Sequence, residues 1–262
     1  MQAIQNPGLW RWPAIVDSTS VVKGLVVSLM IVFVVGCADQ RRTLPPPILR
    51  IGIPHVQPAP ARAAPQWTYT PPAVNPAPYA FRNVTIVVDP GHGGEDPGTR
   101  GSGFSILPEK SINLTIAQDL TQILRSRGAN AIITRGGDYF IELSDRAAKG
   151  NNAGASLFIS VHSDASRNPD ASGLTVYIGN NASGASERVA QSIVNAVRAS
   201  GLECRGVKRA NYKVLRESNG PAVLIECGFL TNFGNARALN TPYYRSQIAS
   251  VIAQGIASYF RW

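Results

Sequence analysis

The stretch VTIVV, Val84 to Val88, begins the part of the chain whose residue pattern decides the fold. It is a short apolar run of the kind that forms a buried strand. Ser111 is a typical helix-capping residue and Gly128 a typical helix-ending one. Between them, apolar side chains recur at helical spacing, at Ile112, Ile116, Leu120, Ile123 and Leu124. A second apolar run, Asn130 to Thr134, follows, so the sequence predicts a strand, helix, strand unit, which is typical of parallel sheets.

The same alternation of apolar runs and helical patterns continues to the end of the chain. Further helices are expected over about Ser186 to Ala199 and about Tyr243 to Phe260. The expected strands are Val84 to Val88, Asn130 to Thr134, Leu157 to Val161, Leu174 to Ile178, Tyr212 to Leu215 and Ala222 to Ile225. We therefore predict one α/β domain over residues 81–262, with a mostly parallel, roughly six-stranded sheet covered by helices.

A candidate secretion signal lies near the N-terminus. Lys23 is followed by an apolar run from Leu25 to Val35 and then by Gly36 and Cys37. This is the order of charge, apolar region and cleavage site in a signal peptide, and the run is too short to span a bilayer. Residues 34–37, Val-Val-Gly-Cys, resemble a bacterial lipobox. The resemblance implies that residues 1–36 are removed and that Cys37 is acylated; without it, the pattern predicts a plain signal peptide.

The segment before Lys23 is unusually long for the charged region of a signal peptide, and Asp17 offsets the charge of Arg11. We expect translation to start near Val22 instead, which would leave a compact lipoprotein signal. N-terminal sequencing of a precursor that begins at Met1 would contradict this expectation.

Residues 37–80 differ in composition from the domain that follows. Eleven of the 19 prolines of the chain lie between Pro45 and Pro78. The stretch also lacks the apolar periodicity that a core requires. We expect a disordered, lipidated linker, and its part from Leu44 to about Ala80 would reach on the order of 100 Å if it were an extended polyproline helix.

The balance of charges suits an anionic partner. The chain has 25 basic and 16 acidic residues, a formal net charge of +9. A cell-wall polymer, a membrane surface or a nucleic acid would each fit that charge. Because Lys and Arg are scattered without a long basic run, charge alone does not choose among them, and a role in solubility fits equally well.

Two cysteines lie in the predicted domain. Cys204 and Cys227 would form a disulfide in an oxidising compartment only if their Cα atoms came within about 7 Å. Cys227 stands at the end of an apolar strand. We therefore favour buried free thiols, with the disulfide as the alternative.

Four polar residues stand where strands end or helices begin. His92 and His162 lie at or just beyond the ends of apolar strands, Glu109 stands just before the first helix, and Glu226 ends the run Ala222 to Ile225. The carboxyl ends of parallel strands line the crevice in which α/β proteins bind ligands. Two imidazoles and a carboxylate are a common catalytic zinc set. A carboxylate at the end of an apolar run is costly to bury unless it is paired or functional.

Each of these residues also has a purely structural explanation. A single histidine after a strand more often makes a hydrogen bond than binds a metal, and that explanation suffices for His55, which stands among the linker prolines. Glu109 suits the N-terminus of a helix. Glu226 suits one half of a salt bridge. Only the four residues together favour a metal site.

Four segments that contain these residues resemble the zinc-dependent N-acetylmuramoyl-L-alanine amidases, which hydrolyse bacterial peptidoglycan. They are residues 87–94 (VVDPGHGG) followed by Asp96, Gly98 and Gly101; Glu109-Lys110 with Asn113-Leu114; residues 158–165 (FISVHSDA); and residues 221–232 (PAVLIECGFLTN). The segments occur in the order of the family, and the resemblance covers about Val84 to Phe260. Ser163 stands where the family often has alanine. Thr134-Arg135, Asp138, Leu143, Arg146 and Ala147 also follow the family pattern, in structural or substrate-positioning roles.

The resemblance implies a metal centre and a reaction. His92, Glu109 and His162 would bind Zn²⁺, and Glu226 would act as general base and then as general acid. The bond cut would be the amide between N-acetylmuramic acid and L-alanine, in cell-wall remodelling or cell separation. Some relatives carry an inserted inhibitory helix between the fourth strand and the next helix. Here only about Gly179 to Ala185 fills that position, so we predict that the chain lacks such a helix and its gating.

The resemblance also implies where the chain acts and with what. We expect peptidoglycan as substrate, contact with a membrane through the lipid on Cys37, no nucleic acid, and a monomer. The location would be the cell envelope, facing the periplasm. Ala38 stands where an aspartate often retains lipoproteins in the inner membrane, which favours the outer membrane. Two alternatives stay open: a catalytically silent wall-binding lipoprotein, and a zinc hydrolase that cuts a peptide cross-link.

Overall fold

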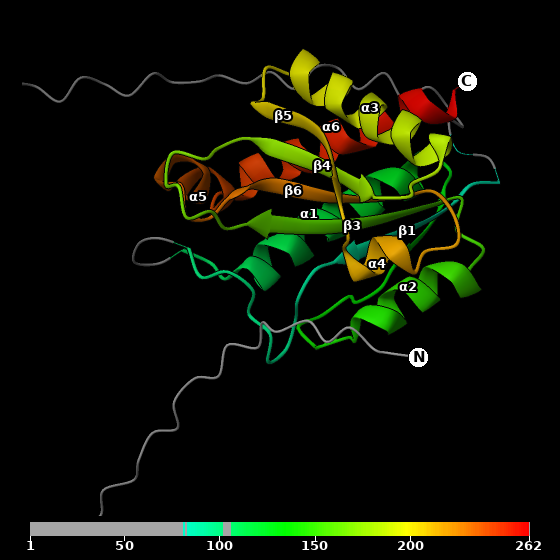
Figure 1. The fold of residues 1–262 in the computed structure, drawn as a ribbon, viewed down its shortest axis with the longest axis horizontal. Coiled ribbons are helices and arrows are strands. Elements are labelled where there is room, and N and C mark those ends of the chain that lie inside the picture. Colours follow the sequence, from blue (N-terminus) through cyan, green and yellow to red (C-terminus); the bar gives the residue numbers. More distant parts are fainter. Residues whose placement is uncertain (1–80, 82, 102–105, 262) are drawn as a thin grey trace, which may run out of the picture. The chain divides into compact units, whose positions relative to one another are not determined.

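The computed structural model describes residues 81, 83–101 and 106–261 (Figure 1). The predictions for the signal peptide, the translation start, Cys37, His55 and the linker lie outside these residues. Within them, no helix is both long enough and apolar enough to cross a lipid bilayer.

A six-stranded sheet forms the centre of the domain, in the order β2-β1-β3-β6-β4-β5. The strands are β1 (Thr85–Pro90), β2 (Asn130–Ile133), β3 (Leu157–Asp164), β4 (Leu174–Gly179), β5 (Cys204–Ala210) and β6 (Ala222–Phe229). All neighbouring pairs are parallel except β4 and β6, which are antiparallel. The predicted fold class, a mostly parallel six-stranded α/β sheet, is confirmed.

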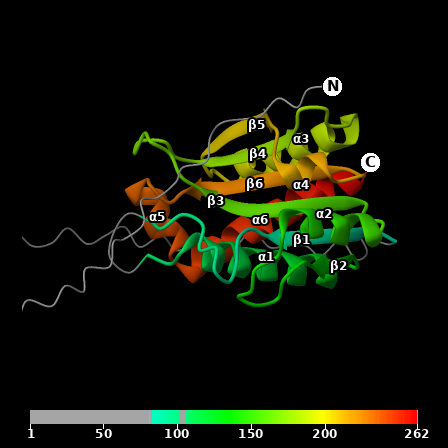
Figure 2. The ribbon, with the colours of Figure 1, turned by 60° about the horizontal axis from the view of Figure 1, so that its bottom comes forward.

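Helices cover both faces of the sheet. The helices are α1 (Glu109–Ser126), α2 (Leu143–Asn152), α3 (Gly184–Ala199), α4 (Lys213–Arg216), α5 (Phe233–Leu239) and α6 (Pro242–Phe260). One face packs against α1, α3 and α6, which form the larger core, and the other against α2 and the short α4. β3 and β6 both run toward the end of the molecule where α5 lies, at the left of Figures 1 and 2.

One predicted strand is wrong and one strand was missed. Tyr212 to Leu215 is not a strand, because residues 213–216 form the helical turn α4. Val214 and Leu215 are both buried against the same small core, and consecutive side chains of a strand would point to opposite faces. The missed strand, β5, lies at the sheet edge. Arg205, Lys208 and Arg209 give it a polar pattern that sequence alone does not mark as a strand.

The helices deviate from the prediction mainly at their starts. α1 begins at Glu109 with Pro108 as its N-cap, so Ser111 is not the cap. Gly128 does follow the end of the helix with a φ of 92°, the conformation expected of a helix-ending glycine. The helices α2 and α5 were not predicted. Both are short, with few buried apolar residues.

Two further predictions concern the cysteines and the connection between β4 and α3. Cys204 and Cys227 are free thiols, and Cys227 is buried while Cys204 is only partly so. The connection from β4 to α3 spans residues 180–183 and holds no inserted helix, as predicted.

Candidate metal centre

His92 lies on a tight loop directly after β1. Its backbone has a φ of 61°, a left-handed conformation that residues other than glycine rarely adopt. Its Nδ1 lies 2.7 Å from Oδ2 of Asp96, and the backbone of Asp96 pairs with that of Gly93. Burial lowers the pKa of His92, but Glu109 and Asp96 outweigh it, so the pKa is raised. A proton held on Nδ1 by Asp96 leaves Nε2 free as a ligand atom.

Glu109 is the first residue of α1 and is 3% exposed. Its Oε2 accepts a hydrogen bond from the Thr99 backbone at 2.8 Å, and its Oε1 accepts one from the Ser163 backbone at 3.1 Å. Burial disfavours its charged form, but the hydrogen bonds and attraction of His162 and His92 prevail and hold its pKa well below the usual range. Glu109 is therefore an ionised carboxylate fixed in one orientation.

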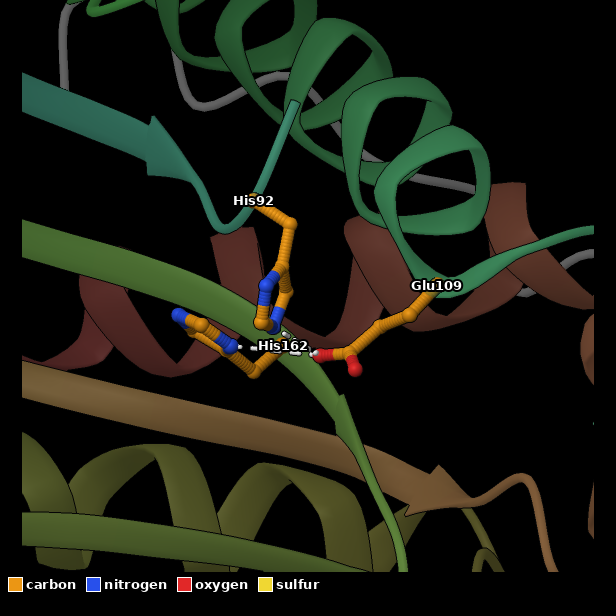
Figure 3. A group of neighbouring side chains, drawn as sticks. All are labelled: His92, Glu109 and His162. Carbon is orange, nitrogen blue, oxygen red and sulfur yellow. Dashed lines mark hydrogen bonds and ion pairs between the residues drawn. The ribbon is translucent and has the colours of Figure 1, made fainter. Parts of the chain in front are cut away.

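His162 is the third residue of the cluster and lies near the end of β3 (Figure 3). Oε1 of Glu109 lies 3.1 Å from Nε2 of His92 and 3.2 Å from Nδ1 of His162. One nitrogen or oxygen of each residue lies within 4.8 Å of those of the other two. Ligand atoms of a tetrahedral zinc ion lie about 3.3 Å apart when the bonds are about 2.0–2.1 Å long. The chemistry and spacing of this donor set therefore fit a zinc ion.

Two glycines leave room for this cluster. A β-carbon on Gly91 would overlap the imidazole of His162, and one on Gly98 would come within 2.6 Å of Oε2 of Glu109. Gly98 also has a φ of 64°, which favours glycine. These two positions of the first segment thus exclude side chains for a spatial reason.

Two buried arginines hold the backbone of the His92 loop. Arg135, 0% exposed, donates to the carbonyls of Pro90 and Gly91, and also to that of Lys110 at the start of α1. Arg146, 1% exposed, donates to the carbonyls of Pro90 and His92 and to Oδ1 of Asp89. Because Arg135 bonds both Gly91 and Lys110, it fixes the spacing between the segments that carry His92 and Glu109.

Arg146→Met is expected to destabilise the domain strongly. Asp89 is fully buried and lies 3.0 Å from Arg146 in an ion pair. Removing one partner of such a pair typically costs about 3–5 kcal/mol, because the other charge is left buried. Denaturant unfolding would measure the loss. Arg245→Met is the matched control: Arg245 is also buried, but it donates to the carbonyl of Leu239 and is only attracted by the partly buried Asp119 without an ion pair among the described residues, so its loss should cost less, about 1.5–3 kcal/mol. Equal losses in the two variants would contradict this account.

Ser163, the departure from the family pattern, has a visible role. Its hydroxyl donates to Oδ1 of Asn113 at 3.0 Å, and the amide of Asn113 donates to Oε1 of Glu109 at 3.2 Å. The hydroxyl thus orients the amide toward the carboxylate. This contact could not be predicted from the sequence, because Ser163 lies on β3 and Asn113 on α1.

Glu226 lies in the middle of β6 and pairs in register with His162 of β3. Neighbouring strands lie about 4.8 Å apart, so the carboxyl stands beside the metal cluster. Glu226 is 6% exposed. Burial raises the pKa of its carboxyl well above the usual range, and the nearby Asp164 and Glu109 raise it further. The structure thus brings together all four residues that the sequence singled out.

Comparisons with known proteins agree with this geometry. Residues 86–258 match the protein family described as N-acetylmuramoyl-L-alanine amidase. The chain belongs to this family. The Bacillus subtilis protein YqiI is 38% identical over 178 residues, which cover 67% of this chain and 84% of YqiI. The crystal structure of an N-acetylmuramoyl-L-alanine amidase from Clostridium difficile 630 superposes with a TM-score of 0.65 at 38% identity, covering 68% of this chain and 97% of that one.

A third relative of this amidase family differs in length. The N-acetylmuramoyl-L-alanine amidase AmiA of Escherichia coli is 33% identical over 223 aligned positions, which cover 68% of this chain and 76% of AmiA. Since 68% of 262 residues is about 178, about 45 of the 223 positions fall opposite gaps in this chain. The aligned part of this chain is therefore about 45 residues shorter than the alignment with AmiA.

Proposed function

We propose that this chain is a zinc-dependent N-acetylmuramoyl-L-alanine amidase, which hydrolyses the amide bond between N-acetylmuramic acid and L-alanine of peptidoglycan. One observation carries the proposal: His92, Glu109 and His162 form a cluster that could hold a metal, and the buried Glu226 lies beside it. The chain is a member of the amidase family. A wall-binding protein would need neither a metal site nor a carboxylate beside it.

In this proposal His92, Glu109 and His162 hold the metal. Zinc bound there would supply a Lewis acid that polarises the amide carbonyl and lowers the pKa of water toward about 7. Asp96 keeps a proton on Nδ1 of His92 and so presents Nε2 to the metal. Glu109 contributes the one negative charge of the set, held in place by the Thr99 and Ser163 backbones.

Glu226 moves the proton. It accepts a proton from the water that attacks the carbonyl carbon, and it passes this proton to the amide nitrogen as the C–N bond breaks. The products are the carboxylic acid of the muramic acid lactyl group and the free amine of L-alanine. Glu226 ends the cycle in the state in which it began.

Mass spectrometry of digested peptidoglycan tests the proposal. Purified peptidoglycan would be incubated with the full chain in detergent, with zinc and with a chelator. We expect free stem peptides and intact glycan strands with zinc, loss of this release with chelator, and its return when zinc is added back. The short β4–α3 connection predicts that no activating protein is needed. Protein bound to undigested wall would favour the wall-binding alternative, and cut cross-links with stem peptides still attached to muramic acid would favour the peptidase.

The location of the enzyme is part of the same proposal. The family and its substrate place its work in the cell envelope. Anchoring by a lipid on Cys37, a periplasmic orientation and the outer membrane rest on the sequence around residues 34–38. With the linker of residues 37–80, such an anchor would let the domain reach the wall from the membrane.

A further inference from the structure

Two polar atoms beside the metal cluster are buried without a hydrogen-bond partner. Among the described residues, the buried side-chain atoms that lack a partner are Oγ1 of Thr175, Oε2 of Glu226 and Nε of Arg245. Buried polar groups are almost always hydrogen-bonded, so each exception calls for an explanation. Two of these three atoms belong to residues that face each other across the sheet.

Thr175 and Glu226 are direct partners in the antiparallel pair of β4 and β6. Side chains of directly opposite residues point to the same face and have β-carbons about 4.5–5.5 Å apart. Thr175 is 0% exposed and Glu226 is 6% exposed. The hydroxyl and the carboxylate therefore share one buried space.

The other neighbours of Thr175 in its row offer no competing partner. On the far side, Thr175 pairs with Gly206 of β5, which has no side chain. On the other side, Thr175 pairs with Glu226 of β6, which in turn pairs with His162 of β3. Across β3, β6 and β4 the residues in register are thus a proposed metal ligand, His162, then Glu226, then Thr175. The hydroxyl of Thr175 is the last polar side-chain group of this row.

We propose that Thr175 is a positioning residue for Glu226. Its hydroxyl donates a hydrogen bond to Oε2 of Glu226 during turnover, and this bond holds the carboxylate so that Oε1 faces the attacking water. Thr175 contacts neither the substrate nor the metal. This inference rests on the proposed function, since it assigns Glu226 the proton transfer described above.

The proposal predicts opposite effects on stability and on rate for one substitution. Thr175→Val keeps the shape and the β-branch but removes the hydroxyl. Removing a buried hydroxyl that lacks a partner should leave the thermal unfolding midpoint unchanged or raise it. The loss of a hydrogen bond to a charged group should lower kcat by roughly ten- to hundredfold. KM should change little, because the substrate is not touched.

The experiment compares three variants of the full chain in detergent on soluble muramoyl peptides. Thr175→Val tests the hydroxyl, and Thr175→Ser restores it on a smaller side chain and should retain most of the wild-type kcat. Thr121→Val is the matched control, since Thr121 is also a buried threonine but donates to the Ala117 carbonyl within α1 at 2.7 Å. It should keep the wild-type kcat.

Each result decides the question. Low kcat, full zinc content and an unchanged or higher unfolding midpoint in Thr175→Val, with rescue in Thr175→Ser, would support the positioning role. Wild-type kcat in Thr175→Val, equal losses in Val and Ser, or loss of zinc in Thr175→Val would overturn it. A wild-type chain that releases no stem peptide would instead overturn the proposed function, so the two failures are distinguishable.

Discussion

Glu226→Gln should nearly abolish hydrolysis while the protein keeps its metal and its fold. Glutamine has almost the same shape as glutamate but does not accept a proton at neutral pH. General acid–base catalysis typically contributes about 10²–10⁴-fold to a rate, so kcat should fall by that factor. The unfolding midpoint should not fall, because Glu226 is buried and Oε2 has no hydrogen-bond partner among the described residues. Stem-peptide release, zinc content and thermal unfolding measure the three quantities.

Glu187→Gln provides the matched control for this variant. Glu187 lies in the first turn of α3 and forms an exposed ion pair with Arg209. The same chemical change at that surface site should leave kcat at the wild-type value. If Glu226→Gln retained the wild-type rate, the proton-transfer role of Glu226 would be refuted even with zinc bound.

His162→Ala should weaken zinc binding by about a hundredfold and abolish activity. Four-ligand zinc sites in small domains bind with about 10–16 kcal/mol, so one ligand carries on the order of 3 kcal/mol, or about a hundredfold in affinity. Glu109 would also lose the nitrogen that lies 3.2 Å from Oε1. Competition with a chromophoric chelator measures the affinity, and stem-peptide release measures the activity.

His55→Ala is the matched control for the loss of a histidine. The sequence places His55 among the prolines of the linker, so this variant should bind zinc and release stem peptides like the wild type. A His162→Ala protein that still bound one zinc ion with wild-type affinity would show that the metal site lies elsewhere.

The sequence predicted those parts of the fold that follow a simple repeat. The helix of residues 109–126 was found because Ile112, Ile116, Leu120 and Leu124 recur on one face, and all four are fully buried. Its first residue was missed, since Pro108 leaves no side-chain cap to mark the start. β5 was missed because an edge strand with three basic residues lacks the apolar run of a central strand.

The same contrast holds for the site. His92 follows β1 and Glu109 begins α1. His162 and Glu226 follow apolar runs that the sequence marks, although the strands β3 and β6 continue beyond them, and the structure brings the four residues together. The contacts that support them join residues far apart in the chain. Thr175 faces Glu226 only because β4 pairs antiparallel with β6. The residue pattern of neither segment predicts that pairing.

The two arginines behind the His92 loop bear on the order in which the protein matures. Arg135 and Arg146 fix the carbonyls of Pro90, Gly91 and His92 through bonds that involve no metal. The backbone of the His92 loop is thus held by contacts within the protein itself. We therefore expect the loop to take this shape on folding, before an ion is bound, and to keep it when a chelator removes the metal.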